Sequence, residues 1–164
     1  DSNHNYYVLD LDRFKTDRIS DYFKRILSLH QKYGFRTLIA EYTAAQSVII
    51  KDLKENYIKT YGLALSVKDH KPTRHEGSKV ERMNATLQPR YENRQVWHYP
   101  GGNCQLLEQE LVLKYPPHDD LKDAVAITME YLQAPTFFSK VTDDVSFGAH
   151  TLKNITNVRF GGIG

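Results

Sequence analysis

Acidic residues gather in the last third of the chain, directly after a pair of prolines. His118, Asp119, Asp120 and Asp123 place three carboxylates and an imidazole within six residues. Proline cannot lie inside a helix and aspartate is a good N-cap, so a helix is predicted to begin at Asp119 or Asp120 and to run to Leu132. Residues three and four positions apart share a helical face. The carboxylates therefore either cap this helix in water or converge on a divalent cation that neutralises them.

Another candidate, Glu41, directly follows one of the short apolar stretches of the first half of the chain. The pattern predicts strands at 5–11, 35–40, 63–67 and 95–99, and helices at 17–33, 44–60, 103–113 and 121–132. This alternation indicates an α/β fold with parallel strand pairs and helices on the faces of the sheet. Such folds bind ligands at the carboxyl ends of their strands, so Glu41 is either a ligand or a solvated strand-end carboxylate.

Positive charge is concentrated between these two acidic positions. Residues 68–94 contain seven lysines and arginines against four acids, an excess of three. We predict a loop at 68–78 and a short helix at 79–87 that stops before Pro89. The basic residues are either ordinary surface charges or a patch that grips phosphates, for which the candidates are Lys71, Arg74, Lys79 and Arg82.

Composition restricts the class of protein. The 164 residues suffice for one domain with a hydrophobic core, placed here at 1–133, and an extended tail at 134–164. The net charge of +2 gives no global basic field, and the single cysteine, Cys104, excludes an intramolecular disulfide and a cysteine-rich zinc site. No apolar run reaches the ~20 residues of a membrane span and no signal peptide opens the chain, so we expect an intracellular protein without a membrane partner.

The candidate ligands are all carboxylates, which suits a hard cation. Glu41, Asp119 and Asp120 offer only oxygen and leave positions for water, an arrangement that Mg²⁺ or Mn²⁺ accepts better than zinc. Two such ions about 3.5–4 Å apart can hold a phosphodiester, activate a water molecule and stabilise the leaving oxygen. Other enzyme classes lack their motifs, since the sequence contains neither a Gly-x-Ser-x-Gly elbow nor a Gly-rich phosphate loop.

An ordered set of short motifs extends this interpretation. It begins with Tyr7-Val8-Leu9-Asp10 and with the apolar stretch that ends in Glu41, followed by Gln46. It continues with Lys79-x-x-Arg82-Met83-x-x-Leu87-x-Pro89, Val96-Trp97, Leu107-x-x-Glu110-Leu111 and Pro116-Pro117-His118-Asp119-Asp120-x-x-Asp123-Ala124. In their order and spacing, these motifs resemble the nuclease domain of phage large terminase subunits from about residue 6 to residue 132.

The resemblance implies a ribonuclease H-like mixed sheet with helices on both faces, and a metal-dependent endonuclease that cuts concatemeric double-stranded DNA during viral packaging. Glu41 would match the second metal-binding acid of the family, and Asp119 or Asp120 the last, with two Mg²⁺ or Mn²⁺ ions between them. The implied partners are DNA, the terminase ATPase region, the portal and the small terminase subunit, in the cytoplasm of the infected host cell.

Further residues take supporting roles by the same resemblance. Asp123 would be an additional metal ligand, and His118 would orient the ligands. By the resemblance Lys79 and Arg82 would lie near DNA, and Lys71 and Arg74 are DNA-binding candidates from the basic patch alone.

The chain departs from the family at its first strand, which carries the first acid and is not present upstream of residue 6. Asp10 and Asp12 are outside candidates for that acid, because their strand matches a later one of the family. We therefore expect a nuclease domain lacking its first strand, inactive until another chain supplies the acid. Two alternatives are a catalytically incomplete DNA-binding or assembly module, and a structural protein whose tail at 141–164 binds a capsid or portal partner.

Overall fold

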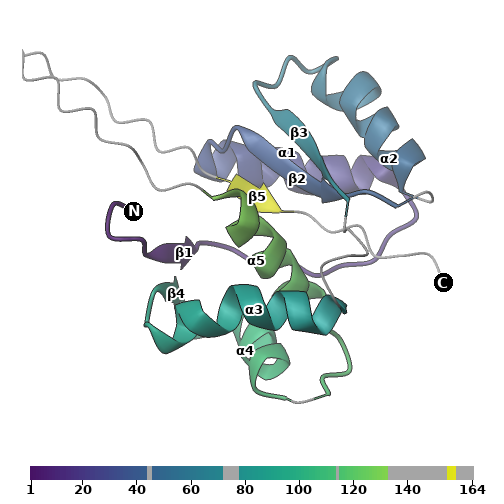
Figure 1. Cartoon of the computed structure of the whole chain (residues 1–164). Coiled ribbons are helices and arrows are strands. Elements are labelled where there is room, and N and C mark those ends of the chain that lie inside the picture. The colour runs from purple at the N-terminus through teal and green to yellow at the C-terminus, as the bar shows by residue number, and fades with distance from the viewer. Residues whose placement is uncertain (44–45, 72–77, 114, 133–154, 158–164) are drawn as a thin grey trace, which may run out of the picture.

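A computed structural model describes residues 1–43, 46–71, 78–113, 115–132 and 155–157 (Figure 1). It contains, in chain order, β1 (Tyr6–Val8), α1 (Ile19–Tyr33), β2 (Thr37–Glu41), α2 (Ser47–Asp52), the π-helical η1 (Leu53–Ile58), β3 (Ser66–His70), α3 (Lys79–Glu92), β4 (Val96–His98), α4 (Cys104–Val112), α5 (Asp120–Tyr131) and β5 (Ile155–Asn157). The predicted α/β class is confirmed. No helix among these residues is long and apolar enough to cross a membrane.

The described residues form two hydrophobic cores, of which the first surrounds β2. The amphipathic helix α1 buries Tyr22, Phe23 and Ile26 against this strand, and Gly34 ends the helix in a left-handed conformation, with φ of 62°. Its N–H donates to the carbonyl of His30, which satisfies one of the last free carbonyls of the helix. Each fully buried aliphatic or aromatic side chain of this core contributes about 1.5–3 kcal/mol to folding, which holds the strand in place.

The second core lies between α3, α4 and α5, with β1 and β4 at its side. In Figure 1, α3 and α4 lie on one side of α5, and β2 and β3 lie on the other. The buried residues of this core are Met83, Leu87, Leu107, Leu121, Val125, Ala126 and Met129. The helix α5 therefore belongs to the second core while it also packs beside β5 of the first sheet.

The described strands pair only in parallel. One sheet has the order β3-β2-β5, and β1 pairs with β4 in a second sheet. Glu41 is the register partner of His70, and Ile39 is the partner of Lys68. Side chains alternate between the two faces of a strand, so Glu41, Lys68 and His70 share one face, while Leu38 and Ala40 point into the first core.

Two expectations differ from the structure. The third strand lies at Ser66–His70, where it pairs with β2, and not at 63–67; Leu65 is buried in the first core before the strand begins. The helix that begins at Lys79 continues through Pro89, with helical hydrogen bonding resumed by the Asn93 N–H to the Pro89 carbonyl. In the tail, β5 pairs with β2, whereas the rest of 134–164 lies outside the described residues.

Candidate functional site

Glu41 is half-buried at the carboxyl end of β2, the central strand of its sheet. The next residue, Tyr42, donates its N–H to the carbonyl of His70 at 2.7 Å, which continues the strand pairing past the end of β2. Glu41 and His70 thus lie on adjacent strands, at the same edge and on the same face of the sheet.

The helix α5 contacts this face through its last residue. The Tyr131 hydroxyl lies 3.2 Å from Nδ1 of His70, and the two rings meet edge to face with centroids 5.8 Å apart. Nζ of Lys68 lies 5.9 Å from the centre of the Tyr131 ring, at the outer range of a cation–π contact. We call Glu41, Lys68, His70 and Tyr131 the strand-edge cluster.

His70 is the most enclosed polar residue of the strand-edge cluster, since only 5% of its surface is exposed. Its Nδ1 meets Tyr131, but its Nε2 is buried without a hydrogen-bond partner among the described residues. Buried polar atoms normally find a partner in the protein, in water or in a bound ion. This nitrogen belongs to the register partner of Glu41, and a bound ion would satisfy it.

A second charged cluster lies at the start of α5. Asp119 occupies the N-cap position, as predicted, but its side chain makes no capping hydrogen bond. Instead, its carboxylate lies 2.8 Å from Nζ of Lys79, which also lies 3.5 Å from Asp123. Arg82 approaches Asp123 at 3.7 Å and Glu130 at 3.9 Å. We call Lys79, Arg82, Asp119 and Asp123 the helix-start cluster.

The sequence positions Lys79 at this place through a capping box. The Ser78 hydroxyl accepts the Glu81 N–H at 3.3 Å, and the Glu81 carboxylate accepts the Ser78 N–H at 2.7 Å. These bonds fix Lys79 as the first residue of α3. Two predicted DNA-binding cations, Lys79 and Arg82, are thus brought together with two predicted metal ligands.

Glu110 of α4 caps α5 in place of the expected aspartate side chain. Its carboxylate accepts the Lys122 N–H at 2.8 Å and lies 3.3 Å from the Arg13 guanidinium. Burial raises the pKa of Glu110, and the Lys122 N–H and the charge of Arg13 offset this only in part. The sequence places Glu110 in a family-like motif, and the structure shows that it holds the start of the acidic helix.

The remaining candidates are dispersed. Asp120 lies in the first turn of α5, and His118 is exposed just before it. Lys71 is exposed after β3, where Nζ lies 4.6 Å from the centre of the Tyr42 ring. Arg74 lies outside the described residues.

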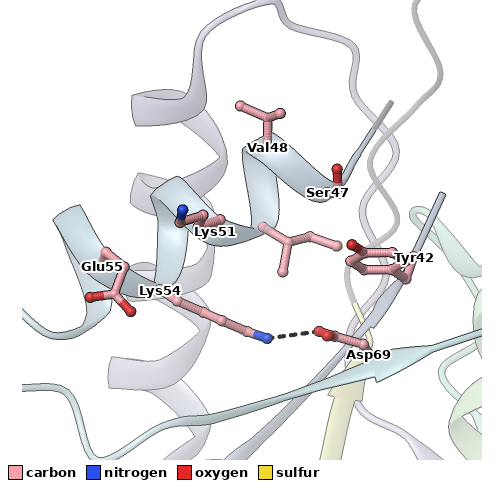
Figure 2. Close-up of a pocket in the computed structure, with 8 residues that line it drawn as sticks. Tyr42, Ser47, Val48, Lys51, Lys54, Glu55 and Asp69 are labelled. Atoms are coloured by element: carbon pink, nitrogen blue, oxygen red, sulfur yellow. Dashed lines mark hydrogen bonds and ion pairs between the residues drawn. The ribbon is translucent and has the colours of Figure 1, made fainter. Parts of the chain in front are cut away.

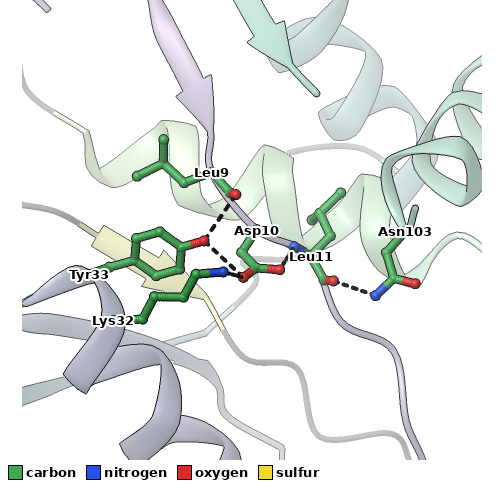
Figure 3. A network of polar contacts seen from close by, with 6 residues as sticks. All are labelled: Leu9, Asp10, Leu11, Lys32, Tyr33 and Asn103. Carbon is green, nitrogen blue, oxygen red and sulfur yellow. Dashed lines mark hydrogen bonds and ion pairs between the residues drawn. The ribbon is translucent and has the colours of Figure 1, made fainter. Parts of the chain in front are cut away.

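Asp10 ties the loop after β1 to α1 (Figure 3). The Asp10 carboxylate accepts hydrogen bonds from Nζ of Lys32 at 3.0 Å and from the Tyr33 hydroxyl at 2.9 Å. Burial alone would raise the pKa of Asp10, but these hydrogen bonds and the charge of Lys32 outweigh it, so this pKa is lowered. Asp12 pairs with Arg25 at 2.9 Å. Both acids therefore have a structural role that the sequence does not reveal.

The two clusters lie at opposite ends of α5. Asp120 and Tyr131 are eleven residues apart in this helix, which corresponds to about 16 Å along its axis. Among the described residues, no group of three or more His, Cys, Asp or Glu side chains is placed to hold a metal ion. Glu41 and His70 are neighbours at one end of α5, and Asp119 and Asp123 are neighbours at the other, so the described arrangement does not bring Glu41 together with Asp119 or Asp120.

A pocket of about 300 Å³ opens on the other face of the same sheet (Figure 2). Nζ of Lys54 lies 2.8 Å from Asp69, whose side chain alternates with those of Lys68 and His70 along β3. The lining includes Tyr42, Val48 and Lys51 and none of the predicted site residues. The pocket is therefore separate from the strand-edge cluster.

Sequence reasoning missed His70 and Tyr131. The stretch Ser66–His70 is mostly polar, so apolar periodicity favours the preceding leucines as the strand. Pairing with the buried β2 was the missing signal, because it aligns His70 with Glu41. The sequence indicates Tyr131 as the last residue of the helix, before Leu132. It does not indicate that Tyr131 meets His70, because that contact depends on how α5 packs against the sheet.

Comparisons of the chain with protein-family models, with curated proteins and with solved structures give no match.

Proposed function

We propose that this chain forms part of a divalent-metal-dependent endonuclease of a viral DNA-packaging terminase, with a ribonuclease H-like fold, that hydrolyses phosphodiester bonds of concatemeric double-stranded DNA. The observation that supports this most is the position of Glu41. It ends the central parallel strand, on the sheet face that is contacted by the helix carrying Asp119, Asp120 and Asp123. Carboxyl ends of parallel strands are where α/β folds place their ligands.

In this proposal, Glu41 binds Mg²⁺ or Mn²⁺ at the carboxyl end of β2, and Asp119 or Asp120 binds a separate ion at the opposite end of α5. When bound, the ion at Glu41 activates water and stabilises the leaving oxygen. The described residues do not contain a group of three donors, so at least one further donor comes from outside them. A strand of another chain is the source we propose, which makes the isolated chain inactive.

In this proposal, Lys79 and Arg82 bind the phosphates of DNA. In the structure, these cations neutralise Asp119 and Asp123. A metal ion at the acids would release the cations to contact phosphates, which are the groups that lysine and arginine bind in non-specific DNA recognition. Lys71 is exposed near the strand edge and would extend the same contact. The portal, the small terminase subunit and the ATPase region remain the proposed protein partners, in the host cytoplasm.

The test is cleavage of supercoiled plasmid in Mn²⁺ by the chain alone and by the complete packaging assembly. The proposal expects no cleavage by the isolated chain, and cleavage by the assembly that Glu41→Ala and Asp120→Ala each abolish. Asp17→Asn is the control, because Asp17 is an exposed acid before α1. The assembly with this variant should cleave at the wild-type rate. Cleavage at the wild-type rate by Glu41→Ala would refute the assignment, provided that its circular dichroism matches the wild type.

A second candidate function is a DNA-binding or assembly module without catalysis. One observation favours it: Lys79 and Arg82 already neutralise the carboxylates at the start of α5, so that end of the helix is balanced without a metal ion. Calorimetry separates the two functions. Absence of Mn²⁺ binding to the assembly, together with retained DNA binding, would select the assembly module.

A further inference from the structure

We propose that Nε2 of His70 is a nitrogen ligand of the metal ion held by Glu41, and that the strand-edge cluster consequently takes Mn²⁺ in preference to Mg²⁺. This inference rests on the proposed function, since it requires that Glu41 binds a cation. It adds a ligand and a metal preference that an all-carboxylate site would not have.

Strand pairing makes Glu41 and His70 neighbours. They are register partners on parallel strands, and the hydrogen bond from Tyr42 to the His70 carbonyl extends the pairing beyond them. Adjacent strands lie about 4.8 Å apart, and paired side chains leave the sheet on the same face. A carboxylate and an imidazole in this relation can bind one ion between them.

The other nitrogen of the ring prepares Nε2 for this role. Nδ1 lies 3.2 Å from the Tyr131 hydroxyl, so an Nδ1–H that donates to this oxygen leaves the lone pair on Nε2. Metal-binding histidines commonly make such a bond through the nitrogen that does not bind the ion, which fixes the tautomer and the orientation of the ring. His70 is 95% buried and its Nε2 has no hydrogen-bond partner among the described residues, so a bound ion would satisfy an atom that is otherwise left orphaned.

The donor set decides the metal preference. Mg²⁺ prefers an octahedron of oxygen atoms and binds imidazole poorly, whereas Mn²⁺ accepts nitrogen together with oxygen. One carboxylate and one imidazole, with water or a further acid in the remaining positions, form a mixed set.

The experiment uses the full chain with Mn²⁺ and pulsed electron paramagnetic resonance. Wild-type protein should show modulation from a directly bound ¹⁴N nucleus, and labelling with ¹⁵N-histidine should replace it by the ¹⁵N signal. His70→Ala should abolish the modulation and raise the Kd for Mn²⁺ at least about ten-fold, while the Kd for Mg²⁺ changes by less than about two-fold. His4→Asn is the matched control, because this histidine is exposed in the turn before β1, and asparagine tolerates its left-handed backbone, so both the signal and the affinity should be unchanged.

The outcomes separate this inference from the proposed function. Mn²⁺ that binds in a Glu41-dependent way without nitrogen modulation, or with modulation that persists in His70→Ala, overturns the role of His70 and leaves the nuclease proposal standing. Absence of Mn²⁺ binding to the wild-type chain and assembly overturns both. If His70→Ala does not fold, His70→Gln keeps the side-chain size, and the ¹⁵N-histidine experiment on wild-type protein still decides whether an imidazole binds the ion.

Discussion

The two clusters at the ends of α5 differ in the groups that lie against their polar side chains. In the helix-start cluster, Asp119 and Asp123 lie 2.8–3.7 Å from the cations of Lys79 and Arg82. In the strand-edge cluster, Lys68 makes a cation–π contact with Tyr131, and Nε2 of the buried His70 has no hydrogen-bond partner among the described residues. The comparison teaches that lysine and arginine side chains lie against the acids of the first cluster, whereas the second cluster offers a buried imidazole nitrogen to a ligand.

The largest effect is expected from Asp123→Ala. Asp123 is fully buried, and its removal leaves the Arg82 guanidinium, only 12% exposed, without its closest buried counter-charge. Breaking one side of a buried ion pair costs about 3–5 kcal/mol, so we expect a loss of unfolding free energy near the lower end, since Glu130 still pairs with Arg82. Urea denaturation followed by circular dichroism measures this loss.

Asp119→Ala is the matched comparison in the same cluster. Its carboxylate is 37% exposed and meets Lys79, which is 35% exposed. Pairs with such exposure contribute about 0–1 kcal/mol, so this substitution should lower the unfolding free energy by less than about 1 kcal/mol. Equal losses for Asp119→Ala and Asp123→Ala would show that burial does not distinguish the two acids.

Lys79→Ala tests whether Lys79 prevents metal ions from binding at the helix-start cluster. Removal of Lys79 leaves two carboxylates facing one another with less positive charge nearby. Two neighbouring carboxylates with no lysine between them attract a cation more strongly. The affinity of this end of α5 for Mn²⁺ should therefore rise about ten-fold, equivalent to about 1.4 kcal/mol. Calorimetry in the Glu41→Ala background isolates this site, and unchanged heats would mean that Lys79 does not control metal access.

The comparison also shows what sequence pattern can and cannot predict. The helix at 17–33, the buried strand before Glu41 and the helix start at Asp119 follow from local rules of apolar spacing, capping and proline exclusion, and all three are confirmed. The strand at 63–67 is wrong because its range is decided by pairing with β2, a contact between residues far apart in the chain. Pro89 lies inside α3, which continues to Glu92 and packs the partly buried Tyr91 against the second core.

The candidate site is predictable in the same partial way. Residue type indicates Glu41, Asp119 and Asp123 as potential ligands, but it does not indicate that Lys79 and Arg82 face these acids. That contact depends on how α3 packs against α5, which no local pattern encodes. The role of His70 likewise depends on strand register and on the position of the last residue of α5.

Tyr131→Phe probes the strand-edge cluster with a smaller expected effect. The substitution removes the hydroxyl that meets Nδ1 of His70 and keeps the ring beside Lys68. A typical hydrogen bond contributes about 0.5–1.5 kcal/mol, so we expect a loss of about 1 kcal/mol in unfolding free energy. Thermal and urea unfolding measure this loss. A variant as stable as the wild type would mean that the hydroxyl does not hold the imidazole, and the tautomer assigned to His70 would lose its basis.

The smallest effect concerns Glu110, which supports the helix-start cluster from behind. Burial holds its folded-state pKa above the ordinary value of 4.5. Between these two pKa values the folded chain binds more protons than the unfolded chain, so the Glu110 contribution to unfolding free energy falls as the pH rises through this window and is constant above it.

Glu110→Gln cannot ionise, while its amide oxygen can still accept the Lys122 N–H. The stability of the wild type relative to this variant, measured by urea unfolding from about pH 4 to about pH 7, should therefore decline with rising pH. A relative stability that increases with pH instead would contradict this prediction. It would show that Arg13 and the helix N–H groups outweigh burial and hold the Glu110 carboxylate as an anion.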